Sequence, residues 1–319
     1  MSSQLLDFEK PLIELEAKIE ELKKFSKEKG IDLADEIKTL QTKSETLKKN
    51  IYGNLTPWQR ISIARHPERP GVLDYIKMLF EGFMEMHGDR YYGDDPALVG
   101  GIARFNGQPV TVIGHVKGKN TKENLARNFG MPHPEGNRKA LRLMEQAEKF
   151  GRPVFSFVDT PGAYCGIGAE ERGQAQTIAA SLTRMMTLRV PVIPTIIGEG
   201  GSGGALAIAV GDYILMLENA VYSISTPETF ASILLKDSTK AQEVAGVMKM
   251  TARDLEGFGV IDEIIAEPLG GAHKNAPEMA RTLGKSLQKA LNSIKKLPPE
   301  KMLEKRYEKF RGIGQLISG

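Results

Sequence analysis

A glycine-rich stretch at residues 198–211, GEGGSGGALAIAVG, has the residue types and spacing of a binding or catalytic loop. From Gly198 its glycines fit G-x-G-x-x-G, the pattern of dinucleotide-binding loops, and around Ser202 they fit G-x-S-x-G, the pattern that presents a nucleophilic serine. A third interpretation uses no side chain. If Gly203 and Gly204 begin a helix, their backbone N–H groups are free to bind phosphate or to stabilise an oxyanion.

The first two interpretations each meet a difficulty further along the chain. Glu218 lies 20 residues after the first glycine, where a ribose-binding carboxylate is expected, but the helix at 203–210 is short for a dinucleotide-binding crossover. A hydrolase triad in this fold class needs an acid and then a histidine after Ser202. Asp262 could supply the acid, but His273, the one histidine that follows, lies in a loop with its own glycines.

A second glycine-rich loop, DTPGAYCGIGAEERGQ at 159–174, follows the preceding predicted strand. Ligands of open α/β sheets bind at the carboxyl ends of the strands, so two such loops face one crevice. N–H groups from Gly162 or Ala163 can then join those of Gly203 and Gly204 around one oxygen atom. This arrangement favours enolate or acyl chemistry over hydride transfer.

Three predicted strands position these loops, and each begins with a proline: 109–114, 153–159 and 191–197. Proline is tolerated at the first residue of a strand, where its missing N–H matters least. Helical patterns at 136–150 and 171–188 separate the strands, and this alternation indicates an α/β fold. Apolar periodicity predicts further strands at 99–105, 213–218, 221–225 and 260–265, and a helix over 72–86.

Ahead of this domain the sequence predicts an antiparallel helical hairpin. Heptad-like apolar residues recur over 11–25 and 33–51, with a charged break ending at Gly30 between them. The hairpin either packs on its own domain or docks on a partner. We divide the chain into the hairpin and a linker for assembly at 1–70, the α/β domain at 71–296, and a basic tail or helix at 297–319, which we expect to be solvent-exposed.

Composition narrows the class of protein. The formal charge of +3 arises from 43 Lys and Arg against 40 Asp and Glu, so charge alone does not imply a nucleic-acid partner. The N-terminus lacks a signal-peptide pattern, and no apolar run approaches the roughly 18 residues of a membrane span. Cys165 is the single cysteine, which excludes an intrachain disulfide and a Cys-rich zinc site and suits a reducing compartment. We expect a cytoplasmic protein.

Three motifs that occur in order relate the sequence to a known family. They are DTPGAY at 159–164, GAEERGQ at 168–174 and GEGGSGGALAI at 198–208. The sequence closely resembles the family of α subunits of bacterial acetyl-CoA carboxylase carboxyltransferase. Further matching segments cover nearly the whole chain, at 6–9, 100–104, 127–131, 134–136, 138–144 and 267–273.

The resemblance implies a crotonase-like (ClpP/crotonase) α/β fold, a spiral of repeated ββα units. It also implies an enzyme that transfers the carboxyl group of carboxybiotin, carried on the biotin carboxyl carrier protein, to acetyl-CoA. The product is malonyl-CoA, in the first committed step of fatty acid biosynthesis. Such a chain is active only with a β subunit, and the two are expected to form an α2β2 heterotetramer. Biotin carboxylase is a further expected partner. The β subunit carries a zinc ribbon, whereas we expect this chain to bind no metal and no covalent cofactor.

Both substrates develop negative charge on an oxygen during this reaction, so two oxyanion holes are required. Carried over from the family, the N–H groups of Gly203 and Gly204 serve the biotin oxygen, with Gly162 and Ala163 as the second choice. The residues expected to bind substrate are Tyr164, Gly166, Gly200, Gly201, Arg138 and Lys139. Two alternatives stay open: a serine hydrolase that uses Ser202, and a binding module that only scaffolds the β subunit.

Overall fold

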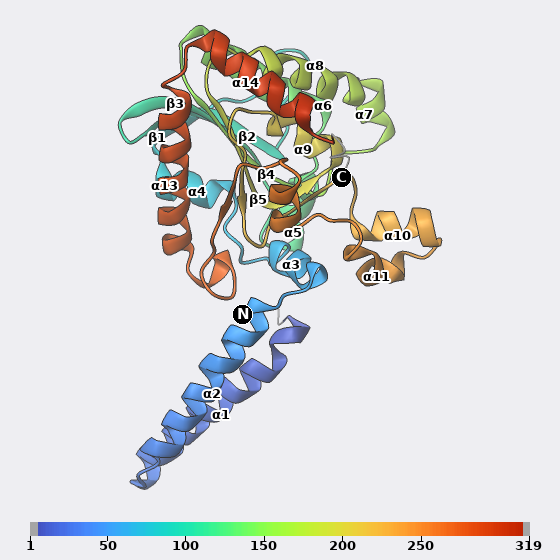
Figure 1. Ribbon diagram of the computed structural model, residues 1–319. Helices are drawn as coiled ribbons and strands as arrows, with labels where there is room; N and C mark the ends of the chain where they lie inside the picture. Colours follow the sequence, from blue (N-terminus) through green and yellow to red (C-terminus); the bar gives the residue numbers. More distant parts are fainter. Residues whose placement is uncertain (1–5, 315–319) are drawn as a thin grey trace, which may run out of the picture.

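Eight strands form one mixed sheet at the centre of this computed structural model, which describes residues 6–314 (Figure 1). Their order is β1-β2-β3-β4-β5-β6-β8, and β7 pairs with β5. Pairing is antiparallel from β1 to β3 and parallel from β3 onward. The strands are β1 Glu81–Glu85, β2 Leu98–Phe105, β3 Gln108–His115, β4 Val154–Thr160, β5 Val192–Gly201, β6 Leu215–Leu217, β7 Val221–Ser223 and β8 Glu263–Ile265.

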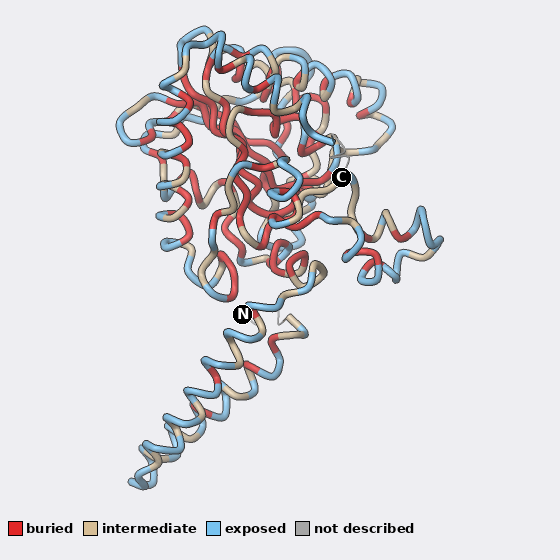
Figure 2. Tube along the Cα trace, in the orientation of Figure 1, coloured by how far each residue is buried: buried red, intermediate tan, exposed pale blue. Residues whose placement is uncertain are grey.

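Local sequence explains how the sheet is built. Asn106 and Gly107 join β2 to β3 with φ angles of 48° and 78°, and Asn-Gly is the preferred pair for such a two-residue hairpin turn. The parallel strands β4 and β5 are buried along their whole length, as their apolar sequences require. Figure 2 shows this buried sheet as the centre of the body.

Helices cover both faces of the sheet (Figure 1). On one face α6, Pro134–Lys149, packs beside α8, Gln174–Thr187, which contacts α9, Ser202–Ala209. On the other face α4, Val72–Leu79, packs against α13, Ala276–Ile294. The remaining helices are α3 Pro57–Ala64, α5 Thr121–Ala126, α7 Ile167–Glu171, α10 Pro227–Leu235, α11 Ala241–Ala245, α12 Ala252–Gly257 and α14 Pro299–Gly312, with 3-10 turns at Asp7–Glu9, Asn128–Gly130, Ser238–Lys240 and Ala272–Lys274. Within residues 6–314, every helix is too short or too polar to span a bilayer.

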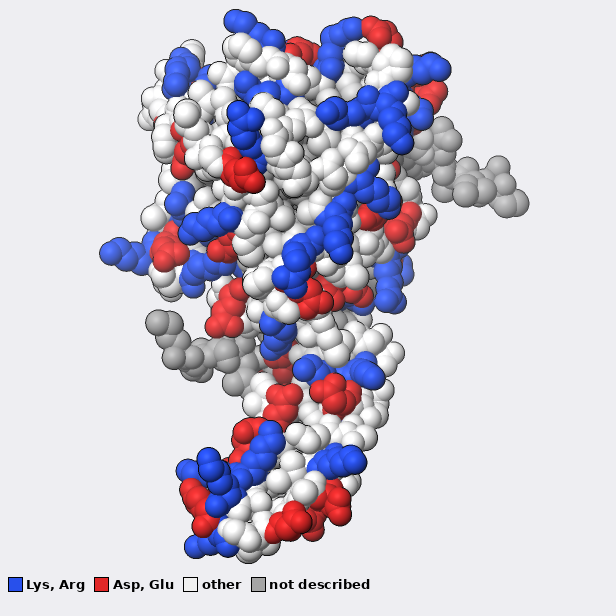
Figure 3. Space-filling model, turned by 90° about the vertical axis from the view of Figure 1, so that its left-hand side faces the viewer, with Lys and Arg blue, Asp and Glu red and all other residues white. Residues whose placement is uncertain are grey.

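Two helices, α1 Lys10–Lys29 and α2 Ala34–Gly53, pack against each other and project from the body as an arm (Figure 1). Gly30 ends α1 with a φ of 66°, a left-handed conformation that glycine adopts without strain. At the base of the arm the Tyr52 hydroxyl donates a hydrogen bond to Glu9 Oε1. Acidic and basic side chains are interspersed along the arm on the face seen in Figure 3. The predicted hairpin is therefore present.

Three segments differ from the sequence prediction. The helix predicted over 72–86 ends at Leu79, because Glu81–Glu85 pair with β2 as β1. Gly82 takes a φ of 58° at the irregularity between Glu81 and Met84 in this pairing. No element is predicted for 226–259, where α10, α11 and α12 form. The C-terminal tail is mostly exposed over 297–314, as expected, but its helix packs on the body through Met302 and Arg306. In α14, Arg306 is 1% exposed, and its ion pair with Asp212 at 2.7 Å and its hydrogen bonds to backbone carbonyls make this burial possible.

Candidate active site

The two glycine-rich loops interlock where β4 and β5 end. A Cβ atom placed on Gly201 would lie 2.1 Å from the Pro161 carbonyl oxygen. One placed on Gly204 would lie 2.4 Å from the Gly162 carbonyl carbon and 2.5 Å from the Ala163 nitrogen. These separations are far below van der Waals contact, so the backbone of one loop occupies the space that side chains of the other would fill. The structure thus brings Gly204 directly against the Gly162–Ala163 peptide.

Backbone donors are available at this contact. The helix α9 begins at Ser202 without a side-chain cap, so the first-turn N–H groups of Gly203 and Gly204 have no partner one turn earlier. Within residues 6–314 no acceptor is found for the Ala163 N–H, whereas the Gly162 N–H donates to Thr160 Oγ1 at 3.1 Å. Of the second pair predicted from the sequence, Ala163 is therefore the better donor.

Ser202 adopts a φ of 51°, the sharp strand-to-helix turn that a nucleophile elbow also has. In the described part of the chain, however, no hydrogen bond joins its side chain to a histidine or a carboxylate. His273 instead stacks on His66, with ring centroids 4.0 Å apart, and the Asp262 carboxylate accepts the Ile214 N–H at 2.7 Å. The structure does not bring the residues of the hypothetical triad together.

A cluster of charge lies beneath the two loops. Lys117 Nζ lies 2.8 Å from Asp159 Oδ1 and 2.6 Å from Glu199 Oε2, and Arg65 Nε lies 2.6 Å from Glu199 Oε1. Burial alone would raise the pKa of Glu199, but the two cations outweigh it and lower this pKa to about 2. His115 Nδ1 accepts the Asp159 N–H at 3.4 Å, and burial together with the Lys117 charge lowers the pKa of this imidazole to about 3. His115 is therefore neutral at pH 7.

Four of the predicted substrate-binding residues lie on the interlocked loops. The Tyr164 ring stacks on His133 with centroids 4.1 Å apart. A Cβ on Gly166 would lie 2.5 Å from the Tyr164 ring, and one on Gly200 would lie 2.7 Å from the Tyr222 ring. Gly166, Gly200 and Gly201 therefore have a packing reason to be glycine, in addition to any contact with substrate.

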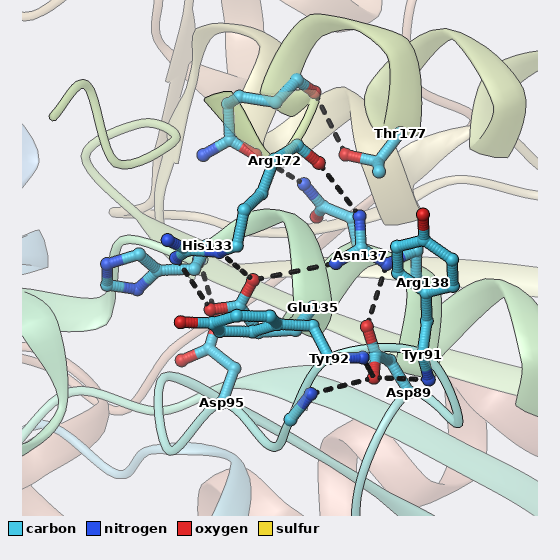
Figure 4. Close-up of polar contacts among 12 residues, drawn as sticks. Asp89, Tyr91, Tyr92, Asp95, His133, Glu135, Asn137, Arg138, Arg172 and Thr177 are labelled. Atoms are coloured by element: carbon cyan, nitrogen blue, oxygen red, sulfur yellow. Dashed lines mark hydrogen bonds and ion pairs between the residues drawn. The ribbon is translucent and has the colours of Figure 1, made fainter. Parts of the chain in front are cut away.

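The other two predicted residues, Arg138 and Lys139, lie on α6. Arg138 belongs to the network in Figure 4, in which its Nη1 donates to the Arg172 carbonyl at 3.0 Å, within the glycine-rich loop at 159–174. Arg138 Nε lies 2.7 Å from Asp89 Oδ2, and its guanidinium lies over the Tyr91 ring. Lys139 is 1% exposed, and its Nζ pairs with Asp94 and donates to the Asp95 carbonyl at 2.9 Å. The structure does not place the Lys139 charge beside the glycine-rich loops.

A cavity of about 430 Å³ lies next to the loops, and sequence reasoning missed two of the basic residues that line it, Arg65 and Arg69. Its walls include Arg65 and Arg69, from a segment read as a proline-rich linker, together with Lys117, Lys119 and Asp159. Arg69 forms a buried ion pair with Glu267 at 2.6 Å and donates to the Ile197 carbonyl. The repeated arginines in RHPERP are the one signal that could have indicated a role for this linker.

The geometry can be compared with known proteins. A family model described as acetyl co-enzyme A carboxylase carboxyltransferase-like matches residues 5–314. This chain belongs to that family. The carboxyltransferase-like proteins most similar to it include acetyl-coenzyme A carboxylase carboxyl transferase subunit alpha of Heliobacterium modesticaldum, 60% identical over 97% of this chain and 92% of that protein. The subunit of the same name from Carboxydothermus hydrogenoformans is 56% identical over 99% of this chain and 98% of its own length.

Solved structures agree on the fold of this carboxyltransferase-like chain. Transcarboxylase 12S matches with a TM-score of 0.54 and 19% identity, over 68% of this chain and 42% of the other. A Pseudomonas malonate decarboxylase hetero-tetramer contains a chain that matches with a TM-score of 0.55 and 19% identity. The match covers 67% of this chain and 86% of that one. At such identities the likeness bears on the fold alone, and it confirms the predicted crotonase-like α/β architecture.

Proposed function

We propose that this chain is the α subunit of an acetyl-CoA carboxylase carboxyltransferase and moves a carboxyl group from carboxybiotin to acetyl-CoA, forming malonyl-CoA for fatty acid synthesis. Membership of the family over nearly the whole chain supports the reaction class. The observation that carries the proposal is the contact of Gly204 with the Gly162–Ala163 peptide. It joins the uncapped start of α9 to a second loop with a free N–H donor, which is the construction an oxyanion hole needs.

In the proposed reaction these donors stabilise the negative charge that develops on the ureido oxygen of biotin. When the carboxyl group leaves as CO₂, the bond between its carbon and the ureido nitrogen breaks, and the electron pair passes to the ureido group and its oxygen. The biotin anion then takes the α-proton of acetyl-CoA, and the enolate carbon bonds to CO₂. We assign the N–H groups of Gly203 and Gly204 to the ureido oxygen, with that of Ala163 as the neighbouring donor. Loss of one such donor costs about 10²–10³ in kcat.

The rest of the reaction requires partners. The family resemblance assigns the thioester oxyanion to a β subunit with a zinc ribbon, and carboxybiotin to the biotin carrier protein that biotin carboxylase loads. Among residues 6–314 no group of three or more His, Cys, Asp or Glu side chains is arranged to hold a metal ion. We propose an α2β2 complex in the cytoplasm, in which the projecting arm of α1 and α2 serves assembly.

The proposal is tested on this chain purified together with a carboxyltransferase β subunit, with malonyl-CoA and biocytin as substrates for the reverse reaction. Gly204→Val drives a side chain into the Gly162–Ala163 peptide, so we expect kcat to fall by at least about 100-fold. Ser202→Ala is the control, at an exposed residue two positions earlier in the same turn, and it keeps every backbone donor. We expect its kcat to stay within about two-fold of wild type.

Two other outcomes separate the alternatives. If Ser202→Ala abolished hydrolysis of an ester substrate that the wild-type chain cleaves, Ser202 would be a nucleophile and the chain a hydrolase. If the β subunit alone converted malonyl-CoA and biocytin as fast as the complex, this chain would only be a scaffold. Circular dichroism of each variant shows whether a loss of activity reflects the site or the fold.

A further inference from the structure

The side chain of Lys117 lies between the two glycine-rich loops. Its Nζ contacts Asp159, the first residue of DTPGAY, at 2.8 Å and Glu199, the second residue of GEGGSGG, at 2.6 Å. Lys117 itself follows β3, the third strand that ends at this edge of the sheet. One ammonium group therefore ties together the chain segments that leave β3, β4 and β5.

We propose that Lys117 is a positioning residue for carboxyl transfer, whose ammonium clamps the two loops and so holds their oxyanion donors in place. This inference rests on the function proposed above. It assigns Lys117 no contact with substrate. Its effect reaches the reaction through Asp159 and Glu199, which continue directly into the segments that carry Ala163 and Gly204.

The β4–β5 pairing shows why a clamp is needed at this point. Val158 pairs with Ile196, but Thr160 pairs with Gly200, so Asp159 faces three residues of β5 instead of one. Such a bulge disrupts the ladder of backbone hydrogen bonds and bends the strand. The Asp159 carboxylate repairs part of the break, because its Oδ1 accepts the Glu199 N–H at 3.0 Å.

The same carboxylate explains the first glycine of the loop. A Cβ on Gly198 would lie 2.4 Å from Asp159 Oδ1. Glycine at this position therefore lets the carboxylate sit inside the bulge, where Lys117 can reach it. The glycine, the aspartate and the lysine form one structural unit rather than three separate features.

Charge makes Lys117 hard to replace in this unit. The side chains of Asp159 and Glu199 are 13% and 11% exposed, and both approach the same ammonium group. Without that cation the two carboxylates would repel each other, and removal of one partner from a buried ion pair is strongly unfavourable. Arg65 holds Glu199 from the other side and pairs with Glu228 of α10 at 2.7 Å, so it cannot replace the bridge to Asp159.

A neighbouring lysine offers a matched control. Lys119 lies two residues further along the same segment and lines the same cavity. Its Nζ pairs with Asp74 at 2.9 Å and donates to the Arg69 carbonyl at 2.6 Å, and neither partner belongs to a glycine-rich loop. A general requirement for positive charge in the cavity would make the two lysines equivalent, whereas a clamp makes them different.

The experiment compares Lys117→Met, Lys117→Arg and Lys119→Met in the full chain purified with the β subunit, with malonyl-CoA and biocytin. For Lys117→Met we expect kcat to fall at least about ten-fold while KM for malonyl-CoA changes by less than about two-fold. Lys117→Arg should recover part of kcat, because it restores the charge between the carboxylates. Lys119→Met should keep kcat within about two-fold of wild type, because Lys119 bridges neither loop, whatever its effect on KM.

Hydrogen exchange followed by mass spectrometry gives a readout that does not depend on activity. Lys117→Met should speed exchange in peptides covering 159–166 and 198–206 together, and leave the β2–β3 hairpin unchanged. Acceleration in neither loop, or equal effects of Lys117→Met and Lys119→Met on kcat, would overturn the clamp. If the wild-type complex transferred no carboxyl group, the proposed function would fail, but the exchange measurement would still decide whether Lys117 holds the loops.

A second variant covers the case in which Lys117→Met does not fold. Asp159→Asn keeps the size of the side chain and its ability to accept the Glu199 N–H, and it removes the negative charge that faces Lys117. We expect slower turnover and faster exchange in both loops. Wild-type values for both measurements would contradict the inference.

Discussion

Two clusters of buried charge in this protein are built alike and serve different parts of the molecule. In the Lys117 cluster, the ammonium group bridges Asp159 and Glu199, and Gly198 leaves room for the Asp159 carboxylate. This cluster joins the ends of three neighbouring strands, from which the glycine-rich loops emerge. Its position connects a set of ion pairs to the donors assigned to catalysis.

The Lys139 cluster, on α6, has the same parts: a lysine paired with carboxylate and carbonyl oxygens, and a glycine that leaves room for an aspartate. Lys139 is bonded to Asp94 and to the Asp95 carbonyl, and a Cβ on Gly136 would lie 2.3 Å from Asp95 Oδ2. That carboxylate accepts the His133 N–H at 2.7 Å, so this cluster fixes the segment before β2 to the start of α6. The comparison teaches that burial and pairing of a lysine do not by themselves mark a functional site. The segments that the lysine connects decide its role.

The largest expected difference comes from the paired glycines. Gly198→Ala and Gly136→Ala both push a methyl group into an aspartate carboxylate, and overpacking of this kind costs about 1–3 kcal/mol of folding free energy. Only Gly198→Ala displaces the carboxylate that Lys117 holds between the loops. We expect it to lower kcat by about 100-fold and Gly136→Ala by less than about three-fold. Steady-state kinetics and urea unfolding of both variants measure the contrast, and equal losses of kcat would remove the distinction between the clusters.

Lys139→Met should act on stability instead. It removes the ammonium group from Asp94, which keeps the Gly88 N–H and His87 as partners, and from the Asp95 carbonyl. Breaking a buried ion pair costs about 3–5 kcal/mol, and less here because the Asp94 side chain is 39% exposed. We expect a loss of about 2 kcal/mol in the free energy of unfolding and unchanged KM for malonyl-CoA in the folded complex. A large rise in KM would instead restore the sequence-based prediction that Lys139 binds substrate.

The contrast also shows what the sequence could predict. The loops and their convergence follow from local patterns, because glycine-rich turns after successive parallel strands must meet at one edge of the sheet. The Lys117 cluster depends on contacts across 82 residues to Glu199, and no local pattern encodes these. Burial of Lys139 did have a signal: it lies one helical turn before Leu143, on the apolar face of α6. A basic residue on an apolar helix face therefore favours a buried ion pair over a phosphate-binding role.

The smallest expected effect is a change with pH in how much the Glu199 carboxylate, paired with Lys117 and Arg65, stabilises the fold. Because Lys117 and Arg65 lower the pKa of folded Glu199 from 4.5 to about 2, its ionised form stabilises the fold above pH 4.5, and this contribution disappears as the pH falls toward 2. The difference in unfolding free energy between wild type and Glu199→Gln should therefore shrink by about 1 kcal/mol from pH 6 to pH 4. From pH 7 to pH 6 it should stay constant, because Glu199 is ionised in both the folded and the unfolded chain. Urea titrations at these pH values measure it, and a constant difference down to pH 4 would mean that the two cations do not stabilise the Glu199 carboxylate.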